Sequence, residues 1–378
     1  MDRFGLYIHV PFCLRKCYYC DFNSVSFNEK LSKSFLNALN KEIDLLAQKY
    51  NPSIRTIFIG GGTPTILGAK ELRLILDKCY NSFKIEKDIE ITIETNPGTL
   101  DEKKLSSLKE GGVDRLSFGV QAFDDDILKR IGRIHTVEQA VKNYYLARKI
   151  GFDNISLDLI FNLPGQTLKD WEGTLKEAMN LDPEHLSTYN LKIEEETKFY
   201  SLIEKGELTY PDEDLDLEMY NLSLDILKSF GYEDYEISNF AKRGYRSKHN
   251  QIYWKNEGYL GVGPGAHFYD GSGRGSNLRD VKEYSNSLLN DKLPIENYNK
   301  LSKEDEIEEE MILGLRLKEG VSISDFNNKY KRSIFDIYGP TIKILKTKGL
   351  LEVNERRVFL TPKGRLLANR VLADFILT

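Results

Sequence analysis

The first half of the chain alternates short β-rich runs with amphipathic stretches. Six runs have the composition of strands: Leu6–Val10, Thr56–Ile59, Ile89–Glu94, Arg115–Val120, Asn154–Phe161 and His185–Leu191. Between them, apolar residues recur at helical spacing, as in residues 31–46 and 137–147. Six strand–helix units in succession predict an α/β fold whose parallel sheet curves into a partial, TIM-like (β/α)6 barrel.

The pattern changes after residue 195. Acidic and aromatic helical segments come first, followed by an aromatic and Gly-rich region from Tyr232 to Asn277. The last segment has the outline of a winged helix, because a helix, a β-hairpin and another helix follow one another. We therefore predict three parts: a barrel domain over residues 1–195, a connecting region over 196–300, and a smaller α+β C-terminal domain over 301–378 with a winged-helix-like end.

Polar and Gly-rich clusters follow the carboxyl ends of the six predicted strands. They are Cys13–Cys20, Gly60–Thr65, Glu94–Pro97, Gly119–Gln121, Asn162–Gly165 and Tyr189–Asn190. The carboxyl ends of parallel strands open at one mouth of a barrel, so we expect the chemistry to lie there. One such cluster alone could be an ordinary strand-to-helix turn, but six together favour a site.

Composition narrows the class of protein. The chain has 378 residues, of which 40% are hydrophobic and 29% charged, which suits a folded protein with a sizeable core. Its apolar runs fall far short of the roughly 20 residues that a membrane-spanning helix needs. The start of the chain leads into a predicted strand without the features of a signal peptide, so we expect a cytoplasmic protein with reduced thiols.

The net charge of −5 conceals a basic end. Residues 340–378 hold eight Lys and Arg against three Asp and Glu, a net of +5, so the rest of the chain carries −10. A winged helix could bind nucleic acid, but the excess is modest and the acidic remainder opposes phosphate binding. No nucleic-acid partner is therefore expected.

Three of the four cysteines form the run Cys13-Leu-Arg-Lys-Cys17-Tyr-Tyr-Cys20. Thiolates at this C-x3-C-x2-C spacing can hold one corner of an iron–sulfur cube and leave one iron open. A zinc site is the alternative, with His9 or Asp21 as the fourth ligand. If the thiols carried no metal, the neighbouring Arg15 and Lys16 would favour reactive thiolates. The fourth cysteine, Cys79, is expected in the core.

Around these cysteines the sequence resembles the radical S-adenosylmethionine (SAM) superfamily, in the branch related to anaerobic coproporphyrinogen III dehydrogenase. The resemblance is carried by Tyr7–Cys13 (YIHVPFC), the cysteine spacing and Gly60–Thr65 (GGGTPT). It implies a 4Fe-4S cluster on Cys13, Cys17 and Cys20, with SAM on the open iron. No residue is assigned a catalytic role. The positions that match the family's SAM contacts are Tyr7, Tyr19, Gly61, Gly62, Thr63, Glu94, Gln121, Arg133 and Asp158.

Two departures separate the chain from the dehydrogenase. That branch usually carries a further cysteine two residues after the third, whereas here Cys20 is followed by Asp21 and Phe22. The dehydrogenase also has a longer N-terminal arm, which has no counterpart before Tyr7. The oxidative decarboxylation of coproporphyrinogen III to protoporphyrinogen IX is therefore the alternative function, and radical SAM chemistry on RNA is a third.

The chain instead contains His249-Asn-Gln-Ile-Tyr253-Trp254, an HNxxYW motif. An exposed imidazole can ligate heme iron, and aromatic side chains can cover a porphyrin face. The plainer interpretation is that His249 hydrogen-bonds within a turn while Tyr253 and Trp254 belong to the core.

Together with Cys20–Ser24 and Gly261–His267, this motif resembles the heme chaperones of the HemW type. The resemblance implies that His249 contacts heme and that heme passes to respiratory acceptor proteins, which could be membrane-associated. Dimerisation is left open. His267 is the second-choice heme ligand and His9 is expected near the cluster, while His135 and His185 receive no role. The acidic run Glu304–Glu310 is expected to be a solvated helix face or to meet a basic partner.

Overall fold

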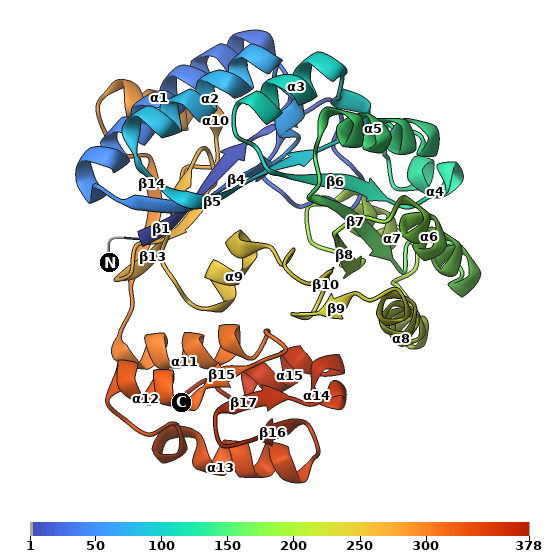
Figure 1. The fold of residues 1–378 in the computed structure, drawn as a ribbon, viewed down its shortest axis with the longest axis vertical. Coiled ribbons are helices and arrows are strands. Elements are labelled where there is room, and N and C mark those ends of the chain that lie inside the picture. The colour runs from blue at the N-terminus through green and yellow to red at the C-terminus, as the bar shows by residue number, and fades with distance from the viewer. Residues whose placement is uncertain (1–2, 378) are drawn as a thin grey trace.

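The computed structural model describes residues 3–377. Its main sheet has twelve strands in the order β14-β13-β12-β11-β1-β4-β5-β6-β7-β8-β10-β9. The six predicted strands are confirmed as β1 (Arg3–Val10), β4 (Ser53–Gly61), β5 (Lys84–Thr95), β6 (Arg115–Gln121), β7 (Ile155–Phe161) and β8 (His185–Asn190). They are parallel neighbours, and the sheet curves without closing, as predicted for a partial barrel (Figure 1).

Strands that the sequence pattern did not predict extend both edges of this parallel core. On the side of β1 they are β11 (Tyr259–Val262), β12 (His267–Tyr269), β13 (Gly273–Asn277) and β14 (Ile295–Lys300), and on the side of β8 they are β10 (Asn239–Ala241) and β9 (Glu233–Asp234). β11 is parallel to β1, whereas the strands beyond it are antiparallel. The predicted division of the chain at residues 195 and 300 stays a prediction.

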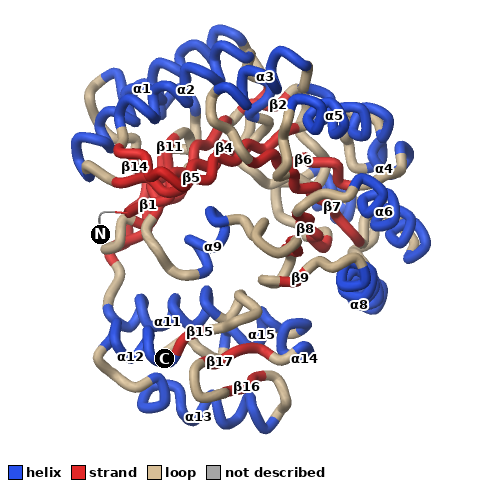
Figure 2. Tube along the Cα trace, in the orientation of Figure 1, coloured by secondary structure: helices blue, strands red, loops and turns tan. Residues whose placement is uncertain are grey.

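Helices cover the convex face of the sheet (Figures 1 and 2). The helices up to the end of the main sheet are α1 (Glu29–Tyr50), η1 (Pro64–Ile66), α2 (Ala69–Ser82), η2 (Pro97–Thr99), α3 (Glu102–Glu110), α4 (Asp125–Arg130), α5 (Val137–Ile150), α6 (Leu168–Leu181), α7 (Lys198–Glu204), α8 (Glu213–Ser229), α9 (Lys248–Trp254) and α10 (Val281–Leu289). Side-chain hydrogen bonds cap the N-termini of several helices. Asn28 caps α1, and capping boxes at Thr136 and Thr167 precede α5 and α6.

Strand alternation sorts the side chains between the two faces of the sheet. Leu6, Ile57, Ile93, Leu116 and Leu157 face the helices and belong to one large apolar core. Their neighbours in sequence face the concave interior, and most of these are polar. The pairing registers align Tyr7, Phe58, Thr92 and Arg115 in one inward row and His9, Gly60, Glu94, Ser117, Ser156 and His185 in the next. Helix α9 lies on this concave side (Figure 1).

The C-terminal part has a core of its own. Its elements are α11 (Lys303–Gly314), β15 (Val321–Ser322), α12 (Ile323–Tyr330), α13 (Ile334–Thr347), β16 (Leu351–Val353), β17 (Arg357–Leu360), α14 (Pro362–Leu366) and α15 (Ala368–Ala373). The predicted helix, hairpin and helix are α13, β16–β17 and α14–α15. Within residues 3–377, no helix combines the length and apolar character needed to cross a bilayer.

Polar contacts attach this part to the barrel. Asp234 accepts hydrogen bonds from Lys318 and Arg365, and the guanidinium of Arg316 lies 4.7 Å from the ring centroid of Trp254. Arg274 pairs with Glu309 of α11 at 2.5 Å. Of the two expectations for Glu304–Glu310, a solvated face or contact with a basic group, Glu309 follows the second, because Arg274 of the barrel pairs with it.

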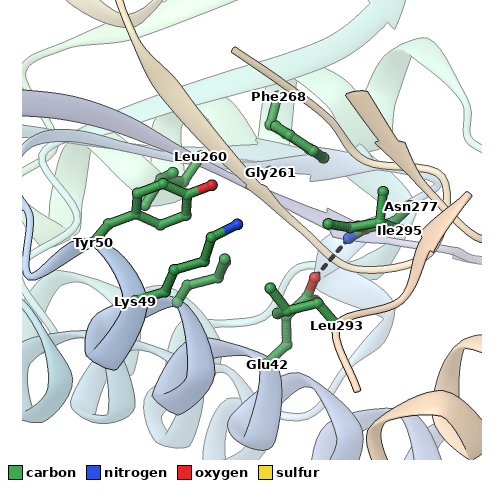
Figure 3. A pocket seen from close by; sticks show the side chains of 10 residues that line it. Glu42, Lys49, Tyr50, Leu260, Gly261, Phe268, Asn277, Leu293 and Ile295 are labelled. Carbon is green, nitrogen blue, oxygen red and sulfur yellow. Dashed lines mark hydrogen bonds between the residues drawn. The ribbon is translucent and has the colours of Figure 1, made fainter. Parts of the chain in front are cut away.

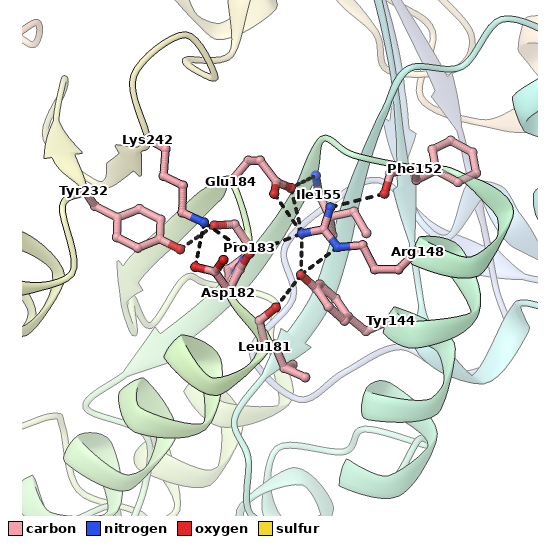
Figure 4. A network of polar contacts seen from close by, with 10 residues as sticks. All are labelled: Tyr144, Arg148, Phe152, Ile155, Leu181, Asp182, Pro183, Glu184, Tyr232 and Lys242. Atoms are coloured by element: carbon pink, nitrogen blue, oxygen red, sulfur yellow. Dashed lines mark hydrogen bonds and ion pairs between the residues drawn. The ribbon is translucent and has the colours of Figure 1, made fainter.

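A network of polar contacts joins α5 to the amino ends of β7 and β8, at the end of the barrel opposite the polar clusters (Figure 4). Arg148 of α5 donates to Glu184 at 2.9 Å, to the Tyr144 hydroxyl at 3.0 Å and to the Phe152 carbonyl at 3.2 Å. Glu184 also accepts from the backbone of Ile155 at 2.9 Å, where β7 begins. One guanidinium thus connects α5 to the starts of β7 and β8.

Replacing Arg148 with Met should destabilise the fold by about 2–4 kcal/mol, because a partly buried carboxylate and a hydroxyl lose their donor together. Chemical denaturation would measure the loss. The adjacent Lys149 forms only an exposed pair with Glu102, so Lys149→Met should cost less than about 1 kcal/mol. Equal losses in the two variants would contradict the role given to Arg148.

Candidate functional site

The three-cysteine loop lies at the carboxyl ends of the parallel strands, between β2 (Phe12–Cys13) and β3 (Val25–Ser26). Its thiols are free and half-buried. The loop is held from several sides: the Tyr18 amide donates to the Ile131 carbonyl at 3.0 Å, and a ring nitrogen of His9 contacts the Asn23 carbonyl at 2.7 Å. The Asn23 side chain in turn donates to the Pro264 carbonyl at 3.0 Å. The mouth of the barrel therefore positions the cysteines.

The thiols do not have the electrostatic environment that we expected. Burial raises the pKa of the Cys13 thiol, and it raises that of Cys20 to about 11. Arg15 and Lys16 are exposed, and Arg15 donates to the Tyr18 hydroxyl at 2.5 Å. The expectation that these two cations favour thiolates is wrong for Cys13 and Cys20, because loss of solvation outweighs their attraction.

A strip of glycines faces the cysteine loop. Gly61 has φ of +113°, and a Cβ there would lie 2.7 Å from the ring of His9. A Cβ on Gly62 would lie 2.6 Å from the Phe12 carbonyl oxygen and 3.0 Å from the Cys13 sulfur. Thr63 continues the strip, with its Oγ1 atom 3.7 Å from the same sulfur. Glycine is thus required where the strip approaches the loop.

Two inward carboxyl groups lie next to the strip. Glu94 accepts from the Gly61 amide at 3.0 Å, and burial, followed by the charge of Asp158, raises its pKa to about 8. Burial also raises the pKa of Asp158, which accepts from Ser117 at 2.8 Å. Glu94 is therefore largely protonated at pH 7, so the site contains both a donor and an acceptor for hydroxyl groups.

Arg133 links the cysteine loop to β6. It donates to the Gly119 carbonyl, and its Nη1 atom lies 3.6 Å from the Cys17 sulfur. Gln121 is near it with φ of +70°, and burial raises the pKa of Tyr19 beside Cys17. On β1, the Tyr7 hydroxyl contacts His9 at 3.0 Å. The residues expected to contact cluster and SAM therefore gather at one mouth, and their individual roles stay predictions.

The cysteines do not form a site for a single metal ion. Across residues 3–377, no three His, Cys, Asp or Glu side chains converge as one ion would require. A tetrahedral zinc ion needs its ligands around one point, at about 2.3 Å for sulfur. A four-iron cluster takes each cysteine on a different iron, so it does not require the three sulfurs to converge on one point.

His249 lies deeper in the barrel than the cysteine loop, and the expectation of an exposed imidazole is wrong. Its side chain is 1% exposed, because it stacks on Phe58 with ring centroids 5.2 Å apart. Its Nδ1 atom contacts the Thr56 hydroxyl and its Nε2 atom the Tyr253 hydroxyl, each at 2.7 Å. Burial lowers the pKa of His249 to about 3. The ring is therefore neutral at pH 7.

The position of His249 depends on residues that the sequence pattern did not single out. Both carboxylate oxygens of Glu90 accept from backbone amides at the start of α9, those of Lys248 and His249, at 2.9 Å each. Glu90 and Thr56 occupy inward positions within strands, whereas the sequence reasoning considered only strand ends. Alternation of polar with apolar residues along β4 and β5 was the signal that could have found them.

The other histidines and Cys79 differ in their surroundings. His9 lies against the glycine strip, while His267, the second-choice heme ligand, is exposed at the start of β12. His135 and His185 are buried, with hydrogen bonds to the Val120 carbonyl and to Ser156 and Tyr235. Cys79 is fully buried in the core, as predicted.

A buried carboxyl group supports the loop that carries Gly263 and Pro264. Glu42 of α1 accepts from Asn277 at 2.6 Å (Figure 3). It also accepts from the Gly263 amide at 2.8 Å and from the Tyr284 hydroxyl at 2.5 Å. A cavity of about 10 Å³, room for about one water molecule, lies beside it. Because Asn23 binds the Pro264 carbonyl, Glu42 connects α1 to the cysteine loop.

Comparison with known proteins agrees with this geometry. The family model of the Radical SAM superfamily matches residues 7–178, and that of the HemN C-terminal domain matches residues 301–367. The heme chaperone HemW of Bacillus subtilis is 45% identical, with 98% of each chain covered. That of Lactococcus lactis is 39% identical, with coverage of 98% of this chain and 97% of the relative.

A solved structure shares the whole fold. The coproporphyrinogen III oxidase HemN from Escherichia coli, described as a radical SAM enzyme, superimposes with a TM-score of 0.86 at 25% identity. The match covers 99% of this chain and 90% of that one. The barrel and the C-terminal part therefore occur together in that enzyme as well.

The stability of the protein should depend on pH through Glu42, whose pKa burial raises from 4.5 to about 7. Protonation of this group favours the folded state, so its contribution is complete below pH 4.5 and is lost as the pH rises to 7. The difference amounts to roughly 3 kcal/mol. Urea denaturation of the wild type and Glu42→Gln at pH 5 and pH 7.5 would measure it.

The free energy of unfolding should fall more steeply with pH in the wild type than in Glu42→Gln, although the variant loses some stability at both values. Glu94 contributes in the same direction to both proteins and cancels in the comparison. Parallel pH profiles would show that Glu42 is ionised in the folded state.

Proposed function

The chain belongs to the HemW family of heme chaperones within the radical SAM superfamily, and from this premise we propose that it binds a 4Fe-4S cluster, SAM and heme and transfers heme to an acceptor protein. The observation that carries the proposal is the arrangement of one barrel interior: three free thiols and a glycine strip at its mouth, and the neutral imidazole of His249 below them. As the family resemblance implies, the acceptor is a respiratory protein.

The cysteine loop fits the cluster. Cys13, Cys17 and Cys20 supply three thiols, and the missing side chain at Gly62 leaves room beside the Cys13 sulfur. Arg133, next to the Cys17 sulfur, would offset the negative charge of bound sulfurs. When bound, such a cluster offers one open iron to the amino and carboxylate groups of SAM.

The residues around the loop fit SAM. The strip Gly61–Thr63 would receive the amino group of SAM through its backbone carbonyl oxygens, because its amides already donate to Glu94, Val10 and Phe12. Glu94 and Asp158 together offer a donor and acceptors for the ribose hydroxyls. Tyr7, Tyr19, Gln121 and Arg133 complete the proposed set of contacts.

Heme binding by His249 requires a rearrangement. The ring is neutral, which is the form that ligates iron, but both nitrogens are engaged. Nε2 must exchange the Tyr253 hydroxyl for iron, while the bond from Nδ1 to Thr56 can hold the ring in place. Phe58, stacked on the imidazole, already provides an apolar surface of the kind that a porphyrin contacts.

The alternative, coproporphyrinogen decarboxylation, is not favoured. The position of the further cysteine is taken by Phe22, whose side chain is 61% exposed beside the cluster loop. Anaerobic incubation with SAM, a reductant and coproporphyrinogen III should therefore yield no protoporphyrinogen IX. Appearance of that product would overturn the chaperone proposal.

Substitution of His249 by Ala should weaken heme binding at least tenfold, since loss of an axial ligand removes a coordination bond. Titration followed by the heme absorbance band would measure the dissociation constant. His185→Ala is the matched control, because His185 is equally buried and hydrogen-bonded but lies on β8. Identical affinities for His249→Ala and wild type would show that His249 is not a ligand.

Substitution of Cys20 by Ser should abolish assembly of a stable cluster, because two thiolates then remain for three irons. Iron and sulfide content after anaerobic reconstitution, together with visible absorbance, would report it. Cys79→Ala, in the core, should retain the wild-type iron content. A Cys20→Ser protein with full iron content would contradict the assignment.

A further inference from the structure

His9 of β1 is a buried imidazole whose two nitrogen atoms both make hydrogen bonds. The residue is 5% exposed. Its Nε2 atom contacts the Asn23 carbonyl oxygen at 2.7 Å, and its Nδ1 atom contacts the Tyr7 hydroxyl at 3.0 Å. Burial lowers the pKa of His9, so the ring is neutral at pH 7 and carries a single proton. His9 therefore offers one donor and one acceptor.

The partners of the two nitrogen atoms determine where that proton lies. A backbone carbonyl can only accept, so the proton is on Nε2, and Nδ1 is left with a lone pair. The Tyr7 hydroxyl must then donate to Nδ1, and burial raises the pKa of Tyr7, so the hydroxyl keeps the proton that it donates. Within residues 3–377, this hydroxyl makes no other hydrogen bond. The Tyr7 oxygen thus presents lone pairs, and no proton, to a ligand in the barrel.

Tyr7 lies where a ligand can reach it. The residue is only partly buried, as are Phe58 and Glu94 on the inward face of the neighbouring strands. The rings of Tyr7 and Phe58 lie with their centroids 6.2 Å apart. On its other side, a Cβ on Gly61 would lie 2.7 Å from the Nδ1 atom of His9, to which Tyr7 donates. The Tyr7 oxygen is therefore close to the start of the glycine strip.

The glycine strip offers acceptors as well. The three amides of Gly61–Thr63 already donate within the protein, so the carbonyl oxygens are the groups that a ligand can use. Of the groups of SAM, the carboxylate only accepts hydrogen bonds and is repelled by a lone pair, whereas the amino group and the sulfonium attract one. A wall of acceptors therefore selects the positively charged methionyl end of SAM.

We propose that His9 is a positioning residue for SAM: by accepting the hydroxyl proton of Tyr7, it turns the Tyr7 oxygen into an acceptor for the positively charged methionyl end. This inference rests on the proposed binding of SAM and adds to it how one end of that molecule is recognised. His9 acts through Tyr7.

Two substitutions separate the two hydrogen bonds of His9. In His9→Asn the amide oxygen takes the place of Nδ1 and can still accept from Tyr7. In His9→Gln the amide nitrogen takes the place of Nε2 and can still donate to Asn23, but no acceptor is left for Tyr7. Calorimetric titration with SAM, under anaerobic conditions and on full-length protein that carries its cluster, would measure the affinity. Iron content would show that each variant has kept the cluster.

Tyr7→Phe and His9→Gln should each weaken SAM binding by about tenfold to hundredfold, the range for a hydrogen bond to a charged group. His9→Asn should keep nearly the wild-type affinity. In a Tyr7→Phe background, His9→Gln should cause no further loss, because the two residues act as one unit. Equal losses in His9→Asn and His9→Gln would overturn the inference, since His9 would then only support the loop.

Two related compounds locate the contact on SAM. Methylthioadenosine keeps the adenine and ribose but lacks both positive groups, so Tyr7→Phe should bind it as the wild type does. An equal loss of affinity for methylthioadenosine and SAM would overturn the inference. S-adenosylhomocysteine keeps the amino group and lacks the sulfonium charge. A loss equal to that for SAM assigns the contact to the amino group, and a smaller loss assigns it to the sulfonium.

Nitrogen NMR of the full-length protein without metal would read the position of the proton directly. The imidazole signals that disappear in His9→Asn should show a protonated Nε2 and an unprotonated Nδ1. A proton on Nδ1 overturns this inference and leaves the proposed function standing. Failure of the cluster-bearing wild type to bind SAM overturns the proposed binding of SAM and the role of His9 together.

Discussion

The interior of this barrel can hold charged side chains only because neighbouring strands supply each of them with a partner. A buried polar group without a hydrogen bond costs free energy. Each inward polar residue therefore limits which residues the neighbouring strands can carry beside it. Glu94 depends on the Gly61 amide, Asp158 on Ser117, and Glu90 on the first amides of α9. The positions of the glycine strip, the two carboxyl groups and His249 all follow from this condition.

Sequence reasoning succeeded where a local pattern determines the structure. The six parallel strands were predictable because their apolar residues alternate or run together, and the mouth of the barrel was predictable because polar clusters follow the strand ends. The edge strands were not, since β13 has the sequence Gly-Arg-Gly-Ser-Asn and owes its place to pairing with β12 and β14.

The surroundings of individual side chains were harder to predict. The burial of His249 is a tertiary property: seven residues of α9 show no apolar face, and only packing on Phe58 and capping by Glu90 enclose the ring. The same is true of Cys13 and Cys20, whose charged sequence neighbours point into solvent. Proximity in sequence therefore grouped the candidate residues at one mouth of the barrel but misjudged their solvation.

The hydrogen bond between His249 and Tyr253 has a kinetic consequence. An imidazole whose Nε2 atom is engaged cannot meet iron until that bond has opened, whatever the concentration of heme. Under the proposed function, heme iron and the Tyr253 hydroxyl therefore compete for the same nitrogen atom, and binding must wait for a local opening of this contact.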